Sequence, residues 1–141
     1  MSTPPIRWKL SLKSSPERVY ATLATDEGRR GFWALEADER DGAIHFRFPN
    51  GMQETSRIVA AQPPSRFELI YFGARTRFEI AADGAGSVLT LTAEDVPEHE
   101  WSEVHAGWVV VLLALKGRVD FGIDLRNGDP SRSWDEGFVD P

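Results

Sequence analysis

The feature that most constrains this fold is one strongly apolar helical segment in the C-terminal third of the sequence. Apolar residues recur at three- and four-residue steps over residues 101–119, which is the spacing of one long helix. Its middle is apolar on nearly every side, because Val109, Val110 and Leu113 add a second stripe to the first. Both faces therefore need cover. We expect a sheet on one face and, on the other, either a homodimer through these three residues or the chain's own tail.

The rest of the chain is long enough to supply that sheet. We expect residues 1–141 to form one domain, since a chain of this length buries about two thirds of the surface that it exposes when unfolded. The core is placed at about residues 6–126, and the long helix is expected to stop at Asn127-Gly128-Asp129-Pro130. Residues 127–141 are then a mostly polar tail.

Alternation of apolar and polar residues predicts strands before the helix. Residues 6–13 alternate, and Ser15-Pro16-Glu17 then offers an N-cap hydroxyl, a proline for the first helical position and an acidic first turn. Two short helices are expected before Leu35. Residues 35–93 alternate in short runs separated by turn sequences such as Asp41-Gly42 and Asn50-Gly51, which is typical of antiparallel hairpins.

This order favours an α+β protein in which a curved antiparallel sheet of about six or seven strands wraps around the long C-terminal helix. Four segments carry a resemblance: Ser15-Pro16-Glu17-Arg18-Val19-Tyr20, Gly31-Phe32-Trp33, Ala61-Gln62-Pro63-Pro64-Ser65-Arg66-Phe67, and Gly107-Trp108 with Leu112, Leu115, Lys116 and Gly117 after it. In these segments, and in their order, the chain resembles the START-like (SRPBCC) superfamily with its helix-grip fold. Within that superfamily it is similar to the branch homologous to the C-terminal domain of the activator of the 90-kDa heat-shock protein ATPase.

The resemblance implies a cavity between the sheet and the C-terminal helix, which the superfamily uses for lipids, polyketides, hormones and other apolar molecules. It implies no particular reaction, because members range from binding proteins through cyclases to co-chaperones on one scaffold. Our leading hypothesis is a domain that binds a small hydrophobic or amphipathic molecule. Two alternatives stay open: a cyclase- or hydrolase-like enzyme that uses the same cavity, and an interaction module with a chaperone partner.

The predicted walls of the cavity are strand residues that alternate toward the helix and the helix residues opposite them. Small-molecule sites are usually apolar with a few polar groups, and aromatic residues make up 11% of this chain. The predicted ligand-binding residues are Phe46, Phe48, Ser56, Ile58, Leu69, Tyr71, Thr76, Phe78, Trp101, His105, Trp108 and Leu112. Glu54 alternates with Ser56, so it is the acid that we examine first, although the surface end of a hairpin is the simpler interpretation of its position.

The outer face of the predicted sheet carries charged residues. Arg57, Arg75 and Arg77 lie on neighbouring predicted strands. We expect them to pair there with Glu68 and Glu79 rather than to point at a ligand, because cross-strand pairs of opposite charge stabilise a sheet.

Charge and cysteine content exclude several other classes. The formal net charge is −6, whereas proteins that bind nucleic acid usually carry a basic surface, so we expect no nucleic-acid partner. The longest apolar run, Trp108 to Leu115, is far shorter than the roughly 20 residues of a membrane span. The absence of cysteine removes disulfides and thiolate sites, and it is consistent with a cytoplasmic protein. No cofactor motif, metal-ligand spacing or catalytic triad is present, so we assign no cofactor, no metal and no catalytic residue.

Overall fold

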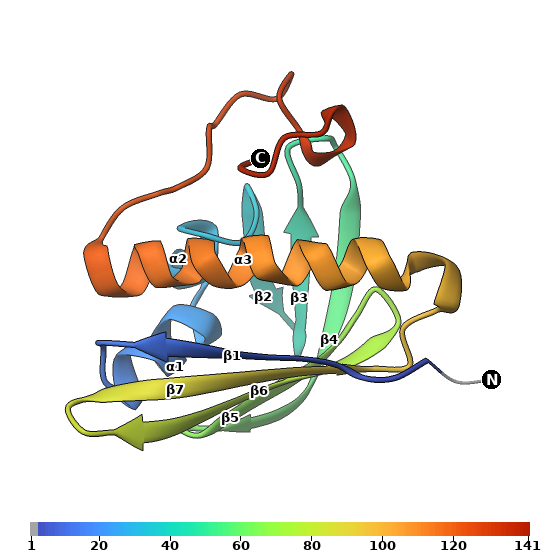
Figure 1. Ribbon diagram of the computed structural model, residues 1–141. Coiled ribbons are helices and arrows are strands. Elements are labelled where there is room, and N and C mark those ends of the chain that lie inside the picture. Colours follow the sequence, from blue (N-terminus) through green and yellow to red (C-terminus); the bar gives the residue numbers. More distant parts are fainter. Residues whose placement is uncertain (1–2) are drawn as a thin grey trace.

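The computed structural model of the chain describes residues 3–141 (Figure 1). The strands are β1 (Ile6–Leu12), β2 (Glu36–Arg40), β3 (Ala43–Arg47), β4 (Gln53–Gln62), β5 (Arg66–Tyr71), β6 (Ala74–Asp83) and β7 (Gly86–Glu94). The helices are α1 (Pro16–Ala24), α2 (Asp26–Arg30) and α3 (Trp101–Phe121), with short 3-10 turns η1 (Glu98–Glu100) and η2 (Trp134–Glu136). All seven strands form one antiparallel sheet in the order β1-β7-β6-β5-β4-β3-β2. The predicted α+β architecture, a curled sheet around a long C-terminal helix, is confirmed.

The sheet bends at β4, and this bend makes room for α3. The first half of β4 pairs with β3, which places Glu54 opposite Phe46, whereas its second half pairs with β5. The register of β4 shifts between Ile58 and Ala60, and an irregularity of this kind bends and twists a strand. As a result β2, β3 and β4 stand behind α3, while β1, β5, β6 and β7 run beneath it (Figure 1).

The two short helices begin where the sequence supplies capping groups. The Ser15 hydroxyl accepts a hydrogen bond from the third backbone N–H of the first turn of α1, so the predicted start of that helix is confirmed. Thr25 caps α2 in the same way, with its hydroxyl accepting from the Gly28 N–H at 3.1 Å. Gly28 lies so close to α1 that a Cβ on it would be 2.3 Å from the Thr22 carbonyl oxygen. Glycine is therefore required where α1 and α2 meet.

The long helix ends earlier than the sequence analysis predicts. α3 stops at Phe121 because Gly122 adopts the left-handed conformation, with φ of 67°. The Gly122 N–H donates to the Arg118 carbonyl and the Ile123 N–H donates to the Gly117 carbonyl, both at 3.1 Å. The first of these bonds is the one that typically closes a helix ending in a left-handed glycine. The prediction of an end at Asn127 was wrong because a single Gly was enough to end the helix.

Both edge strands of the sheet are covered by side chains from the helices. At the β1 edge, the Lys116 ammonium on α3 donates to the Ser11 carbonyl at 2.6 Å. At the β2 edge, the fully buried guanidinium of Arg29 donates to the Ala37 carbonyl at 2.9 Å and to the Leu23 carbonyl at 3.0 Å, and it also pairs with the Asp26 carboxylate. These contacts satisfy edge carbonyls that would otherwise be open to a further strand.

The tail covers one end of α3 and leaves much of its outer stripe open. The Trp134 indole N–H donates to the Glu103 carboxylate at 2.8 Å, and the Asn50 amide donates to Asp135 at 2.8 Å. The tail therefore lies over the beginning of α3 and the β3–β4 turn (Figure 1). Val109 is still 37% exposed and Leu113 is 52% exposed. Within residues 3–141, no helix has the length and hydrophobicity needed to cross a membrane.

Candidate functional site

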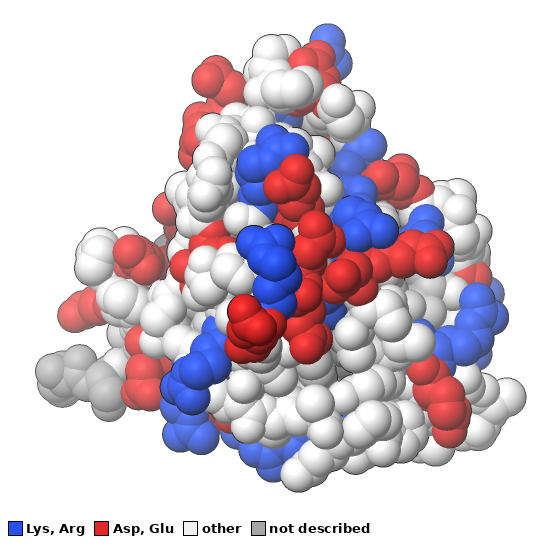
Figure 2. Space-filling view, turned by 180° about the vertical axis from the view of Figure 1, so that it is seen from behind, with Lys and Arg blue, Asp and Glu red and all other residues white. Residues whose placement is uncertain are grey.

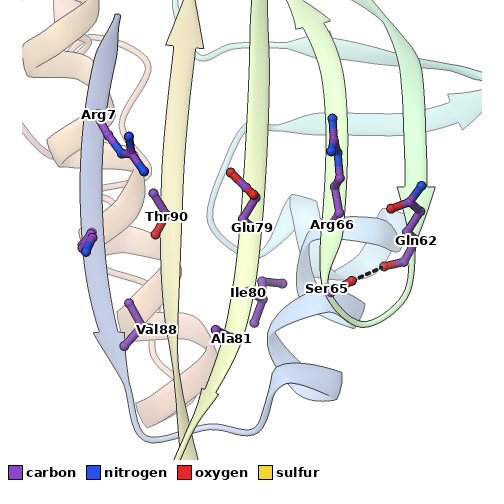
Figure 3. A pocket seen from close by; sticks show the side chains of 10 residues that line it. Arg7, Gln62, Ser65, Arg66, Glu79, Ile80, Ala81, Val88 and Thr90 are labelled. Atoms are coloured by element: carbon purple, nitrogen blue, oxygen red, sulfur yellow. Dashed lines mark hydrogen bonds between the residues drawn. The ribbon is translucent and has the colours of Figure 1, made fainter.

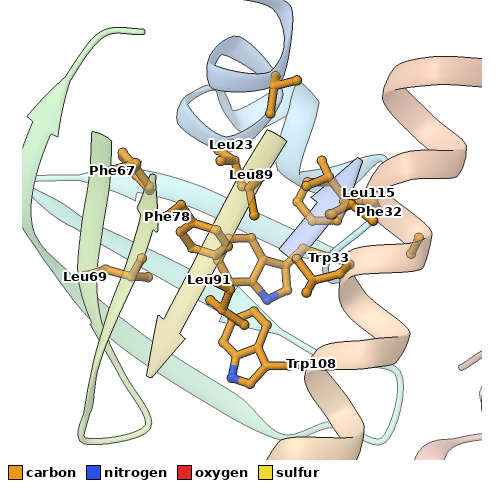
Figure 4. Close-up of a cluster of buried hydrophobic side chains, with 14 of the residues drawn as sticks. Leu23, Phe32, Trp33, Phe67, Leu69, Phe78, Leu89, Leu91, Trp108 and Leu115 are labelled. Carbon is orange, nitrogen blue, oxygen red and sulfur yellow. The ribbon is translucent and has the colours of Figure 1, made fainter. Parts of the chain in front are cut away.

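The space between the sheet and α3 is occupied by a group of aromatic rings around Trp33. Trp33 follows α2 and is only 4% exposed. Its indole lies 4.8 Å from the ring of Phe46, 5.7 Å from Phe78 and 6.0 Å from Trp108, measured between ring centroids. Figure 4 shows Trp33 between Phe78 and Leu91 of the sheet on one side and Leu115 of α3 on the other. Trp33 therefore fills the position where the sequence analysis predicts a ligand.

Aromatic contacts continue from Trp33 to the surface at the β5–β6 turn. The Phe46 ring stacks on Phe48 at 5.9 Å, and the Phe48 ring lies 5.9 Å from Phe72. Phe72 is 39% exposed. Tyr71 contacts Phe72 at 4.8 Å and Trp33 at 5.4 Å. We call this connected series the aromatic column, and its members are Trp33, Phe46, Phe48, Tyr71, Phe72 and Trp108.

Glu54 lies beside the outer end of the aromatic column. It stands opposite Phe46 on neighbouring strands, so its side chain is on the same, inner face of the sheet. Its carboxylate accepts hydrogen bonds from the Phe72 backbone N–H at 2.7 Å and from the Ser56 hydroxyl at 3.3 Å. Phe72 has a φ of 47°, a conformation that non-glycine residues seldom adopt. Glu54 thus stabilises the turn that presents Phe72.

Tyr71 supplies a neutral hydroxyl inside the aromatic column. The Trp33 indole N–H donates to this hydroxyl at 3.2 Å. Burial raises the pKa of Tyr71 well above its ordinary range, and the hydrogen bond from Trp33 only partly opposes that effect. Tyr71 therefore stays protonated and can act as a hydrogen-bond donor or acceptor, but not as a base.

Most of the predicted site residues lie together on the inner side of the sheet and on the facing side of α3. The rings of Phe46, Phe48, Tyr71, Phe78 and Trp108 belong to the Trp33 group. Ser56, Leu69, Thr76 and Leu112 are buried around it, and Ile58 is partly buried against the same core. Their role as ligand-binding residues stays a prediction.

Trp101 and His105 are separate from this group. His105 is stacked between two indoles, 4.9 Å from Trp8 and 4.7 Å from Trp101. The Trp101 indole N–H donates to the Pro4 carbonyl at 2.8 Å. This stack holds the start of α3 against β1 and the preceding residues. Trp101 is therefore on the side of α3 that faces the edge strand β1, where it packs against the margin of the same core, and its role as a ligand-binding residue stays a prediction.

The sequence analysis missed Trp33, Phe72 and Trp8. Trp33 and Phe72 stand in turns, where neither the strand nor the helix period identifies an inward side chain. Trp8 alternates with Leu10 in β1 and points inward, so periodicity alone indicated it, but β1 was not considered as a wall of the site.

Two shallow depressions are present on the surface of the described residues. One, of about 500 Å³, lies on the outer face of the sheet (Figure 3). The other, of about 260 Å³, lies between α1, α2 and Arg118. Neither lies between the sheet and α3. Residues 3–141 also contain no group of three His, Asp or Glu side chains placed to hold a metal ion.

Ion pairs cover the outer face of the sheet, as predicted for Arg75 and Arg77. Arg75 pairs with Glu68 at 3.5 Å and Arg77 with Glu79 at 3.0 Å. Arg57 makes no ion pair within residues 3–141, so this part of the prediction was wrong. Seen from behind, acidic and basic side chains are interleaved rather than gathered into a broad basic surface (Figure 2).

Comparison with solved structures identifies the fold. The solution structure of the Aha1 dimer from Colwellia psychrerythraea superposes with a TM-score of 0.77 at 22% identity, covering 85% of this chain and 98% of that one. The chain has the helix-grip fold. Protein SSP2350 from Staphylococcus saprophyticus gives a TM-score of 0.77 at 21% identity, over 90% of this chain and 99% of that one.

A third similar structure is CalU16 from Micromonospora echinospora, with a TM-score of 0.65 at 19% identity, over 83% of this chain and 76% of that one. The helix-grip fold that the resemblance implies is confirmed, and an Aha1 structure is among those that superpose on this chain. Neither a comparison with protein-family models nor one with curated proteins finds a match.

Proposed function

We propose that this chain binds a small apolar or amphipathic molecule between its sheet and α3. The observation that carries the proposal is the aromatic column, which leads from the buried Trp33 to the part-exposed Phe72. Aromatic side chains provide large and rigid contact area, and they line the usual small-molecule sites. A core needs buried rings, but it does not need a series of them that reaches the surface.

Binding in this mode requires a ring of the aromatic column to move, because the rings contact one another. Phe72 is the outermost and is held at the tip of the β5–β6 turn. Trp33 lies behind it, and the one hydrogen bond of its side chain among the described residues is the 3.2 Å bond to Tyr71. A ligand that displaces either ring replaces ring–ring contacts with contacts of its own, so little apolar area is lost.

The polar group at the entrance favours one kind of ligand. Glu54 brings a negative charge to the outer end of the aromatic column, and Tyr71 brings a neutral hydroxyl. A neutral or positively charged polar end is therefore preferred over a carboxylate. Glu54 already accepts two hydrogen bonds, one of which fixes the turn at Phe72, so we rank binding above catalysis. A chaperone partner stays a prediction.

The test is a fluorescence titration with Nile red, a neutral apolar dye, on variants at two similarly exposed phenylalanines. Phe72 is 39% exposed and Phe138, in the tail, is 37% exposed. Phe72→Asn removes the aromatic ring and introduces a residue that tolerates a positive φ. We expect it to weaken dye binding by about fivefold or more, from the lost apolar contact, and Phe138→Asn to bind as the wild type does. Equal binding by both variants, or no saturable binding by the wild type, would overturn the proposal.

The proposal extends to a homodimer formed through the outer stripe of α3. Val109 and Leu113 are exposed there, and Phe121 continues the same four-residue spacing at 54% exposure. Leu125 packs over Gly117 between them, where a Cβ would lie 3.0 Å from the leucine side chain. An exposed apolar strip along one helix is typical of an interaction surface. The similar structure from Colwellia psychrerythraea is that of a dimer.

Light scattering tests this assembly. We expect a dimer for the wild type and a monomer for Leu113→Glu, because a charge on each copy would face its partner across the interface. Val59→Glu is the matched control, since Val59 is 39% exposed and lies on strand β4 of the sheet. Truncation after Asn127 should leave the dimer intact, because the tail leaves Val109 and Leu113 open. A monomeric wild type at high protein concentration refutes this part of the proposal.

A further inference from the structure

The depression on the outer face of the sheet has a regular construction. One row of residues crosses five strands, in the register Lys9–Thr90–Glu79–Arg66–Gln62. Short side chains form its floor, from Thr90, Val88 and Ala81, whereas long charged side chains rise at its sides (Figure 3). The hollow of about 500 Å³ therefore follows from side-chain length across a continuous sheet.

The charges around this depression do not cancel. Arg66, Arg75 and Arg77 form ion pairs with Glu68, Glu79 and Glu94, at distances from 2.7 to 3.9 Å. Three cations are thus balanced by three anions across β5, β6 and β7. Arg7 and Lys9, on the edge strand β1, make no ion pair with any described residue. The depression carries an excess of two positive charges in a protein whose net charge is −6.

Hydrogen-bond donors around the depression also lack partners. The buried Nε of Arg66 and the buried hydroxyl of Thr92 make no hydrogen bond within residues 3–141. Thr92 stands opposite Arg7 on the neighbouring strand. Figure 3 shows the Arg7 guanidinium extending from β1 toward Thr90 of the neighbouring strand β7. A guanidinium in this position can donate two parallel hydrogen bonds to an oxyanion.

We propose that this depression binds a small organic dianion with carboxylate or phosphate groups. Arg7 and Lys9 neutralise its two charges, and Arg66 offers further donors. The apolar floor of Val88 and Ala81 accommodates the carbon skeleton. A hollow of this size matches a small molecule rather than an extended polyanion. The site lies on the face of the sheet opposite the aromatic column, so it is independent of the function proposed above.

Calorimetric titration with citrate and with inorganic phosphate, at constant ionic strength, tests the site. The variant Arg7→Gln/Lys9→Gln removes the two unpaired charges. Arg40→Gln/Arg57→Gln is the control, because it removes two exposed charges that make no ion pair among the described residues and do not line the depression. We expect the first variant to bind about tenfold more weakly or worse, from the loss of charge-assisted hydrogen bonds, and the control to stay within about twofold of the wild type.

The two probes distinguish the chemistry of the ligand. Tighter binding of citrate supports a carboxylate compound that uses the apolar floor, and tighter binding of phosphate supports a phosphate compound. Amide resonances of Thr90 and Val88 should shift during either titration. Equal weakening in both double variants would mean that only net charge matters, and it would overturn the proposal. So would shifts confined to other parts of the chain, or no binding by the wild type at millimolar concentration.

Discussion

The replacement Trp33→Ala removes the side chain that fills the space between the sheet and α3. Trp33 is 4% exposed, so almost all of its side-chain area, about 200 Å², is withdrawn from water. At about 25 cal/mol per Å² this area is worth about 5 kcal/mol, and measured Trp→Ala costs in cores are about 3–5 kcal/mol. The Tyr71 hydroxyl also loses its hydrogen bond from the indole. We expect the free energy of unfolding to fall by about 4 kcal/mol.

Urea unfolding followed by circular dichroism measures this loss. The chain should still fold, because domains of this size have about 5–15 kcal/mol of stability, but its Tm should fall by on the order of 10 °C. Trp134→Ala is the matched control: Trp134 lies in the tail and is held mainly by one hydrogen bond to Glu103. Its loss should cost about 1 kcal/mol.

Added indole provides a second measurement on the same variant. The space left by Trp33→Ala is lined by Phe46, Phe78 and Trp108, and apolar cavities of this kind stay dry and bind aromatic molecules. Indole should therefore raise the Tm of Trp33→Ala by mass action more than it raises the Tm of the wild type, in which a ring of the aromatic column must first move. A cost below about 1 kcal/mol, or an equal effect of indole on both proteins, would refute the reasoning, because Trp33 would then not be filling a closed space.

Three further predictions concern the scaffold. Arg29→Met should cost about 3–5 kcal/mol in urea unfolding, because it leaves buried acceptors unpaired, whereas Arg30→Met at the surface should cost less than about 1 kcal/mol. Burial tends to raise the pKa of Asp120, but hydrogen bonds from two backbone N–H groups and a hydroxyl after β1 outweigh it and lower the pKa. The stability that the Asp120 carboxylate contributes is therefore present above its unfolded pKa of about 3.9, and it is lost as pH falls through the lower folded pKa. The wild type should accordingly lose more stability than Asp120→Asn between about pH 5 and 3. Parallel curves of unfolding free energy against pH for the two proteins would contradict this. Gly122→Ala should destabilise the protein by about 1 kcal/mol, because the φ of Gly122 is 67°. Gly107→Ala should stabilise the protein by about 0.5–1 kcal/mol, because there is open space for a Cβ at Gly107. A change of stability in the same direction for both variants would contradict the helix end described above.

Local rules were enough to predict the elements of this chain. Ser15 and Pro16 define the start of α1, because capping acts within one turn of helix. Asn50-Gly51 marks a turn between two strands, because a left-handed backbone suits glycine. The order of these elements, with one apolar helix after a run of strands, was enough to predict the fold, since a sheet and a helix each need an apolar partner.

Which side chains fill the space between the sheet and α3 could not be predicted, because some of them belong to residues outside any helix or strand. Trp33 and Phe72 stand in turns, and their inward or outward direction is set by the path of the chain after α2 and after β5. Trp101 has the helical spacing of Trp108, yet it lies near the beginning of α3, where the neighbouring element is β1. Periodicity assigns a residue to a face of its helix, but it does not say which element covers that face at each position.

The sequence by itself determined the α+β packing of a sheet on the long C-terminal helix, the inner position of most predicted site residues and the ion pairs of Arg75 and Arg77, because each follows from alternation or from spacing along the chain. Only the tertiary structure decided that the indole of Trp33 occupies the space between the sheet and α3, and that Arg7 and Lys9 have no ion-pair partner among residues 3–141 beside a hollow on the opposite face. Both outcomes depend on side chains from distant segments of the sequence. These side chains come into contact only when the chain is folded, so neither the space that they fill nor the charges that they neutralise can be read from local sequence.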